Sequence, residues 1–184
     1  ELQKALEKMA AGHRGKVAVF ARNLKSGATV AIRADEPVKT ASVIKLPIML
    51  EVYAQVKAGK RSLADKLTLT KENQVEGSGV LTKLTPGLQL TLEDADMLMI
   101  TLSDNTATNM ILDAVGIAAV NARLQAMGLK ETVLYKKVFK PAEGPMPPEQ
   151  KRFGLGKTTA REMARVMESV YRCELAEKNL CERM

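Results

Sequence analysis

Two polar motifs, each beside an apolar helical run, constrain the fold of this chain more than any other feature. They are Ser42-Val43-Ile44-Lys45 and Ser103-Asp104-Asn105. A serine and a lysine three residues apart at the start of a helix project from one face, so the Lys45 amine is expected within hydrogen-bond reach of the Ser42 hydroxyl. A serine hydroxyl is a poor nucleophile until a neighbouring base takes its proton. Because the chain has a single histidine, the first motif predicts a serine nucleophile with a lysine base.

The segments around the motifs decide between catalysis and an ordinary helix surface. An isolated Ser-x-x-Lys match is weak evidence, because an exposed lysine on any helix produces it. Here the match leads into the apolar run Leu46 to Leu50, and the second motif ends the apolar run Leu92 to Leu102. The second motif could also be a plain turn between helices, with Asn105 or Thr106 as an N-cap. The presence of both motifs favours catalysis.

Together the motifs resemble those of the penicillin-recognising serine enzymes, and of class A β-lactamases in particular. The resemblance runs from the first strand pair to the helix at Thr159. It implies an α+β fold, in which helices flank an antiparallel sheet and an all-α subdomain is inserted. It also implies that Ser42 forms an acyl-enzyme, with Lys45 or a glutamate acting through water as the base. Ser103 would relay a proton to the leaving nitrogen, and Asn105 would hydrogen-bond the substrate amide.

Three further assignments follow from the resemblance. Gly77 and Ser78 fall in the substrate wall, where many class A enzymes carry a bulky tyrosine, so a more open site is expected. Asp104 is expected to tie down its own loop. The Ser42 N–H, at a helix N-terminus, is the natural first donor to the oxyanion. The second donor would come from a strand carrying Lys-Thr-Gly or Lys-Ser-Gly.

Hydrolysis of the acyl-enzyme depends in class A enzymes on a Glu-x-x-x-Asn pattern in the loop before the helix near Thr158. In this chain Glu143 lies at about the right distance from Thr158, and Glu149 is the second choice. Neither is followed by the asparagine. Glu143 is therefore the candidate for activating water, while the missing asparagine counts against efficient turnover of β-lactams.

Periodicity and turn signals predict the order of the elements. We expect residues 1–41 to form an N-terminal helix and a β-hairpin, and residues 42–184 to form a helical subdomain carrying both motifs. Pro47 should distort the first turn of its helix towards 3₁₀ geometry. The expected segments are a helix at Leu2–Met9, strands at Lys16–Leu24 and Ala28–Ala34, helices at 42–58 and Leu92–Leu102, two short helices closed by Gly116 and Gly128, a loop at Lys140–Gly156, and a helix from Thr159 to about Tyr171. Capping boxes are predicted to open the helices at Thr91 and Thr159.

In the family a third strand carrying Lys-Thr-Gly or Lys-Ser-Gly follows the helical block, and two more strands and a closing helix come after it. None of these has a counterpart in the sequence. Gly156-Lys157-Thr158-Thr159 is similar to that motif, but it lacks the glycine after threonine and is interpreted as the entry to a helix. Two strands alone do not make a stable covered sheet. We therefore expect the chain to be a fragment, with the remaining strands supplied by a second chain or segment, or removed.

Composition narrows the partners. The net charge of +7 is read as a solvated basic surface, and with 3% aromatic residues we expect no binding to nucleic acid. His13 is the only histidine and is predicted to be a surface turn residue. A single histidine excludes a histidine metal cluster, and we expect neither a metal nor a cofactor. Cys173 and Cys181 would lie about 12 Å apart on one continuous helix, so a disulfide needs a break between them, and both outcomes stay open.

The function that these observations favour is a serine hydrolase that hydrolyses β-lactams, a small-molecule substrate, through an acyl-enzyme at Ser42. One alternative is a D-alanyl-D-alanine peptidase or esterase acting on acyl-D-alanine substrates. Another is a penicillin-binding sensor module that stays acylated. No apolar run approaches the length of about 20 residues of a membrane span. The chain begins at Glu1 without a visible signal peptide, and the resemblance implies a periplasmic or secreted protein.

Overall fold

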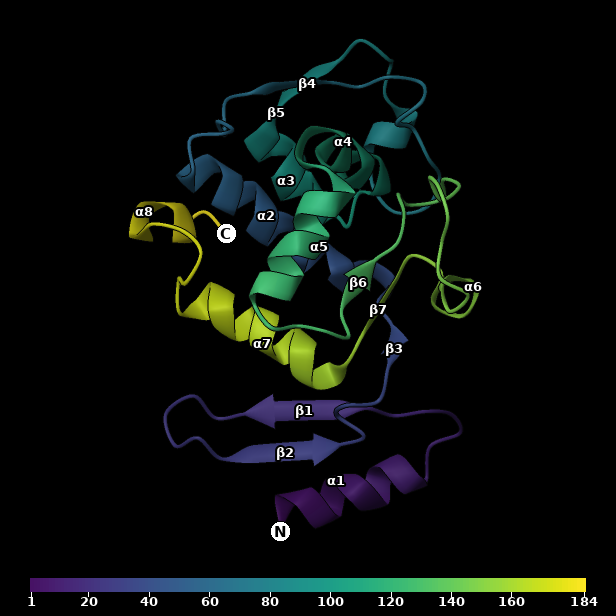
Figure 1. Ribbon diagram of the computed structural model, residues 1–184, viewed down its shortest axis with the longest axis vertical. Helices are drawn as coiled ribbons and strands as arrows, with labels where there is room; N and C mark the ends of the chain where they lie inside the picture. The colour runs from purple at the N-terminus through teal and green to yellow at the C-terminus, as the bar shows by residue number, and fades with distance from the viewer.

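The computed structural model describes residues 1–184. Figure 1 shows an N-terminal part, made of α1 and the hairpin β1–β2, at one end of the molecule and a helical body at the other. The hairpin pairs antiparallel, with Val19 opposite Ile32 and Arg22 opposite Thr29. Gln3 of α1 hydrogen-bonds the backbone N–H and C=O of Ala31 at 3.1 and 2.9 Å. The predicted N-terminal helix and hairpin are therefore confirmed.

The bounds of the elements are as follows. In the N-terminal part they are α1 (Leu2–Ala11), β1 (Val19–Arg22), β2 (Thr29–Ile32) and β3 (Val38–Lys39). In the first half of the body they are η1 (Ala41–Ile44), α2 (Lys45–Lys57), β4 (Lys66–Thr68), η2 (Leu81–Lys83), β5 (Gln89–Thr91) and α3 (Leu92–Thr101). In the second half they are α4 (Asn105–Val115), α5 (Ile117–Ala126), β6 (Val133–Leu134), α6 (Gln150–Phe153), β7 (Gly156–Thr158), α7 (Ala160–Tyr171) and α8 (Lys178–Cys181).

Helix α2 is the centre of the helical body. All its residues from Pro47 to Ala54 are buried, and a helix that is buried on every side must be covered by other elements. Helices α3, α4, α5 and α7 supply that cover, and α7 lies between α2 and the hairpin (Figure 1). The core of the protein therefore surrounds the helix that begins at Lys45.

The helix starts follow the local sequence. The chain enters α2 through the 3₁₀ turn η1, which confirms the distorted start expected from Pro47. Thr91 and Asp94 form the predicted capping box at the start of α3. At α7 half of the box forms, because Thr159 Oγ1 accepts from the Glu162 N–H at 3.1 Å. The Glu162 carboxylate instead accepts from the Glu131 N–H at 3.0 Å and from a threonine hydroxyl, so the predicted second capping box is corrected to a single cap.

Five very short strands were not expected, and two of them, β4 and β5, pair antiparallel within the helical body. β3, β7 and β6 form an antiparallel sheet in that order, with Val38 opposite Thr158 and Val133 opposite Lys157. The segment from Gly156, interpreted above as a helix entry, is a buried strand that ends where α7 is capped. The segment predicted as a loop, Lys140 to Gly156, also contains the short helix α6. Because β3 pairs with β7, the sheet joins the two predicted domains, whose division stays a prediction.

The C-terminal segment folds back onto the core after α7. Cys173 has a positive φ of 58° and turns the chain, which brings its Cα to 5.7 Å from that of Cys181 in a disulfide. The break in the helix that a disulfide needed is thus present. Tyr53 on α2 donates a hydrogen bond to the Arg183 carbonyl at 2.9 Å. None of the helices has the length and apolar character required to cross a membrane.

Two methionines on α3 test this packing. Met99 is fully buried and Met97 is 60% exposed. We expect Met99→Ala to lower the free energy of unfolding by about 2–5 kcal/mol, because it leaves a cavity in the core. The matched variant Met97→Ala should change it by less than about 0.5 kcal/mol. Urea titration followed by far-UV circular dichroism measures both, and equal losses would contradict the orientation of α3.

Candidate active site

Ser42 lies in the 3₁₀ turn that precedes α2, and its side chain is exposed to solvent. Ala41, just before it, has a φ of 43°, and Ser103 has a φ of 53°. Non-glycine residues with positive φ are uncommon, and strained backbone of this kind gathers at functional sites. The two motifs therefore meet at two strained positions of the backbone.

Lys45 is the buried lysine of the site. Its side chain is buried, and Nζ donates to the Ser103 carbonyl at 2.6 Å, to Ser103 Oγ at 2.9 Å and to Asn105 Oδ1 at 3.0 Å. Burial lowers the pKa of Lys45 to about 8, although the nearby charge of Asp104 acts in the opposite direction. A pKa near 8 leaves a substantial neutral fraction around neutral pH, and a neutral amine can accept a proton.

Ser103 connects Lys45 to Ser42. Its Oγ donates to Ser42 Oγ at 3.0 Å and contacts Lys45 Nζ at 2.9 Å. The direct hydrogen bond expected between Lys45 and Ser42 is thus replaced by a path through Ser103. The correction has a simple cause, since the buried lysine amine is turned towards the α3–α4 turn, where its three acceptors lie.

Asp104 is fully buried and holds the backbone around the site. Its carboxylate accepts from the N–H groups of Val80 at 2.7 Å, Leu81 at 3.0 Å and Ala107 at 2.9 Å. The last of these bonds caps α4. The expectation that Asp104 ties down its own loop is confirmed, and the same carboxylate also anchors the loop that contains Gly77 and Ser78.

Asn105 and Gly77 are in close contact. Asn105 Nδ2 donates to the Glu76 carbonyl at 3.1 Å, while Oδ1 is held by Lys45. A Cβ at Gly77 would lie 2.7 Å from Asn105 Nδ2, and Gly77 has a φ of 91°. Only glycine fits there without displacing the amide. The asparagine is therefore fixed on both sides, by the lysine and by the glycine loop.

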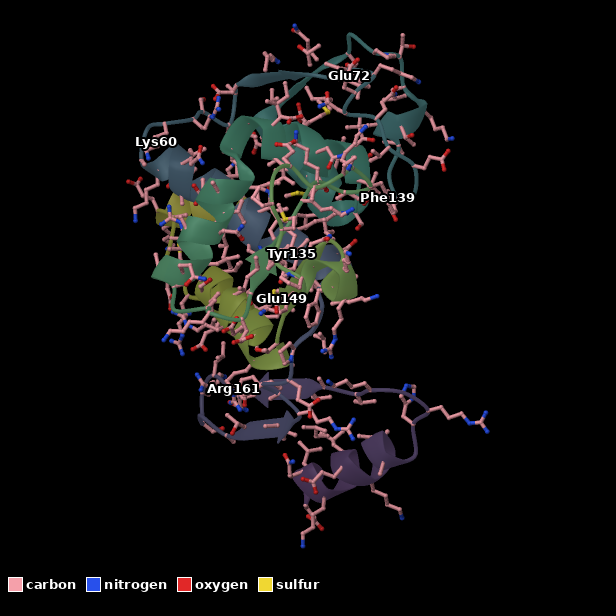
Figure 2. The ribbon with its side chains drawn as sticks, turned by 45° about the vertical axis from the view of Figure 1, so that its right-hand side comes forward. Lys60, Glu72, Tyr135, Phe139, Glu149 and Arg161 are labelled. Carbon is pink, nitrogen blue, oxygen red and sulfur yellow. A yellow bond between two sulfur atoms is a disulfide. The ribbon has the colours of Figure 1, made fainter.

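A cavity of about 450 Å³ opens at Ser42. The residues that line it are Ala41, Ser42, Gly77, Ser78, Asn105, Lys136, Val138, Phe139, Gly154 and Leu155. The structure thus brings four of the predicted residues into the lining, and Lys45 and Ser103 are hydrogen-bonded to two of these, Asn105 and Ser42. The second half of the lining comes from the segments after β6 and after α6. Phe139, labelled in Figure 2, belongs to the first of these segments.

Sequence reasoning missed the lining residues from Lys136 to Leu155. They lie in irregular segments that carry no hydrophobic period. The φ of 52° at Phe139 cannot be read from a phenylalanine. The glycine at 154, which has a φ of 69°, was the one signal that a sharp turn lies beside the cavity.

The structure does not bring Glu143 to Ser42. Its side chain is 80% exposed and forms an ion pair with Lys137 at 3.6 Å, outside the cavity lining. Glu149 is also outside, where its carboxylate accepts from the Tyr135 hydroxyl at 2.7 Å and pairs with Lys157 at 3.1 Å. The sequence assignment of Glu143 as the water-activating residue is corrected, because the proline-rich segment after Lys140 runs along the surface.

The whole chain, residues 1–184, matches a family model described as the β-lactamase enzyme family. It is 33% identical to a β-lactamase of Streptomyces albus G over 125 residues, which are 65% of this chain and 40% of that protein.

Solved structures agree with the sequence comparison. The β-lactamase from Sphaerobacter thermophilus DSM 20745 superposes with a TM-score of 0.84 at 32% identity, over 97% of this chain and 65% of that one. PBP-A superposes with a TM-score of 0.85 at 29% identity, over 99% of this chain and 65% of that one. A mutant of PBP-A is an acyl-enzyme complex with penicillin G. The chain therefore spans less than two thirds of the length of these relatives.

Gly79 offers a test of the Asp104 anchor. A Cβ at Gly79 would lie 2.6 Å from Asp104 Cα, whereas one at Gly87 would meet nothing within 4 Å, and both glycines have a φ near 100° (109° and 99°). We expect Gly79→Ala to cost about 1–3 kcal/mol more unfolding free energy than Gly87→Ala, because the clash adds to the same backbone strain. Chemical denaturation measures the difference, and equal losses would refute the close approach.

Proposed function

This chain belongs to the β-lactamase enzyme family, and on that premise we propose that it is a serine hydrolase that acts on β-lactams through an acyl-enzyme at Ser42. The observation that carries the proposal is the hydrogen-bonded path from Lys45 Nζ through Ser103 Oγ to Ser42 Oγ at the edge of a cavity. A serine with a base in line is the requirement for nucleophilic catalysis.

The path suggests how protons move during acylation. Ser42 Oγ attacks the carbonyl carbon while its proton passes to Ser103 Oγ, and the Ser103 proton passes to neutral Lys45. The carbonyl oxygen becomes an oxyanion. When it re-forms the carbonyl, the carbon–nitrogen bond breaks, and the leaving nitrogen takes a proton back through Ser103. Ser103 and Lys45 then have their original protonation, the proton of Ser42 is on the leaving nitrogen, and the acyl group is bonded to Ser42 Oγ.

The oxyanion faces the start of a helix. Ser42 precedes α2, and backbone N–H groups in the first turn of a helix lack carbonyl partners within it. This position supports the Ser42 N–H as the first donor to the oxyanion. The second donor from a Lys-Thr-Gly strand, and the second chain or segment that would supply it, stay predictions.

A second candidate function shares this first step. It is that of a penicillin-binding sensor or D-alanyl-D-alanine peptidase, in which a β-lactam stays bound to Ser42. The observation that favours it is the composition of the cavity, whose lining residues are all neutral or basic, whereas activation of water requires a base within reach. The acyl-enzyme complex known for a mutant of PBP-A is consistent with such trapping.

The disulfide supports the proposed location. Cys173 and Cys181 are paired, and structural disulfides persist mainly in oxidising compartments such as the periplasm or the exterior of the cell. A periplasmic or secreted protein, which is where β-lactams and cell-wall peptides are encountered, fits this pairing. Reductant-dependent loss of stability would support the pairing, and mass spectrometry with and without alkylation would detect it.

Lys45 gives the first functional prediction. Because the neutral amine accepts the proton and burial lowers the pKa to about 8, acylation should speed up about tenfold per pH unit below about pH 8 and then level off. Lys45→Arg stays protonated, so acylation should be at least about a hundredfold slower at every pH. Labelling of Ser42 by a fluorescent penicillin measures both. Label that persists in Ser42→Ala, or an arginine variant with the wild-type rate, would refute the mechanism.

Hydrolysis of the acyl-enzyme gives the second functional prediction. Because no acidic side chain lines the cavity, we expect the proposed hydrolysis of the acyl-enzyme to be slow, so that penicillin stays attached to Ser42 for minutes or longer before it is released. Glu143→Gln should release it at the same rate, since this glutamate is exposed and paired with Lys137. Intact-mass measurements after removal of free penicillin follow the release. Rapid release by the wild type that is lost in Glu143→Gln would restore the glutamate to the mechanism.

A further inference from the structure

Lys136 lines the Ser42 cavity, and also the neighbouring cavity that Glu143 lines, without forming an ion pair with a carboxylate. It follows β6 by two residues, is half-buried and lines the cavity. Its ammonium makes one hydrogen bond, to the Lys140 carbonyl of its own loop at 3.0 Å. An ammonium has three donors, so two remain for other groups. The next residue differs, because Lys137 is paired with the carboxylates of Asp113 and Glu143.

The surroundings of Lys136 favour an anion. Among the residues that line the cavity, Lys136 is the one that carries a charge. The other lysine of the site is already satisfied, since all three N–H groups of Lys45 have acceptors. An uncompensated positive charge in a concave, partly dry site attracts anions more strongly than the same charge on an open surface. The protein supplies no negatively charged partner for Lys136, and an anionic ligand would supply one.

The backbone holds Lys136 in place. Tyr135, the residue before it, donates from its N–H to the Leu155 carbonyl at 2.9 Å and from its hydroxyl to Glu149 at 2.7 Å. Tyr135 and Glu149 are labelled close together in Figure 2. Glu149 is in turn paired with Lys157 of β7. A binding group that follows a fixed residue loses less conformational entropy when a ligand arrives than one on a free loop.

The position of the cavity indicates which part of a substrate would reach Lys136. The leaving nitrogen must be close to Ser103 and Lys45, which supply its proton and are outside the cavity lining. The acyl group stays bonded to Ser42, which is part of the lining together with Lys136. The side chain of the acyl group would therefore lie in the cavity, next to Lys136.

We propose that Lys136 forms a subsite for an anionic acyl side chain, so that this protein prefers β-lactams and acyl donors whose acyl group carries a carboxylate. The inference rests on the proposed acylation of Ser42. A carboxylate there would accept a charge-assisted hydrogen bond from Lys136 Nζ, and such bonds are about twice as strong as neutral ones. The subsite selects the acyl donor and takes no part in the proton path.

Two penicillins that differ by one carboxylate test the subsite. Carbenicillin is benzylpenicillin with a carboxylate on the acyl side chain. Second-order rate constants for acylation of the full-length protein are measured with both, by competition against a fluorescent penicillin. In Lys136→Met the rate for carbenicillin should fall about tenfold relative to that for benzylpenicillin, which corresponds to about 1.4 kcal/mol. Added salt should reduce the same preference in the wild type.

Two control variants separate charge from disturbance of the loop. Lys136→Arg keeps a cation and should keep the preference of the wild type. Lys137→Met removes a neighbouring charge that is already paired, and it should leave the ratio of the two rates unchanged. A Lys136→Met variant that slows both penicillins equally, or neither, would overturn the subsite while acylation by benzylpenicillin still supports the proposed function. If neither penicillin labels Ser42 in the wild type, the proposed function fails and the subsite fails with it.

Discussion

The burial of the Lys45 amine is the constraint on which the site depends. An amine taken out of water must find acceptors in the protein, and all three of its acceptors belong to Ser103 and Asn105. These bonds fix the start of α2 against the turn between α3 and α4, and they bring Ser103 Oγ to Ser42. The same burial lowers the pKa of Lys45 to about 8. One physical cause therefore both positions the amine and leaves part of it neutral, which the proposed proton transfer requires.

Strained backbone near Ser42 is held by buried hydrogen bonds elsewhere. The positive φ of Ser103 points the Ser103 carbonyl and hydroxyl at the same lysine. The next residue, Asp104, compensates by binding three backbone N–H groups from two segments. A left-handed serine costs about 1–3 kcal/mol and persists where the surroundings over-determine it. The α3–α4 turn is thus maintained by a carboxylate whose hydrogen bonds go to backbone N–H groups and not to Ser42.

The parts of the site that the sequence predicted are those with a local signature. Ser42 and Lys45 share a helix face, and Ser103 with Asn105 ends an apolar helix, so spacing was enough to find them. The path through Ser103 was not predicted, because the direction of a buried amine depends on acceptors from distant segments. Strands of two or three residues such as β6 and β7 are too short to show a period. Glu143 was placed by counting back from Thr158, and the count failed because α6 and several prolines route that loop along the surface.

Two buried lysines, Lys45 and Lys157, have pKa values shifted in opposite directions because only one of them is paired with carboxylates. Burial alone lowers the pKa of Lys157, but the hydrogen bonds that Lys157 donates to Glu149 and Glu131 outweigh it and leave the pKa above its usual value. That lysine stays charged and fixes β7 beside the Gly154–Leu155 wall of the cavity. Lys45 has amide, carbonyl and hydroxyl acceptors instead, and its pKa falls. Because acidic side chains are paired outside the cavity, the lysine beside Ser42 can work as a base, and that same separation leaves the cavity without an acidic group to activate water.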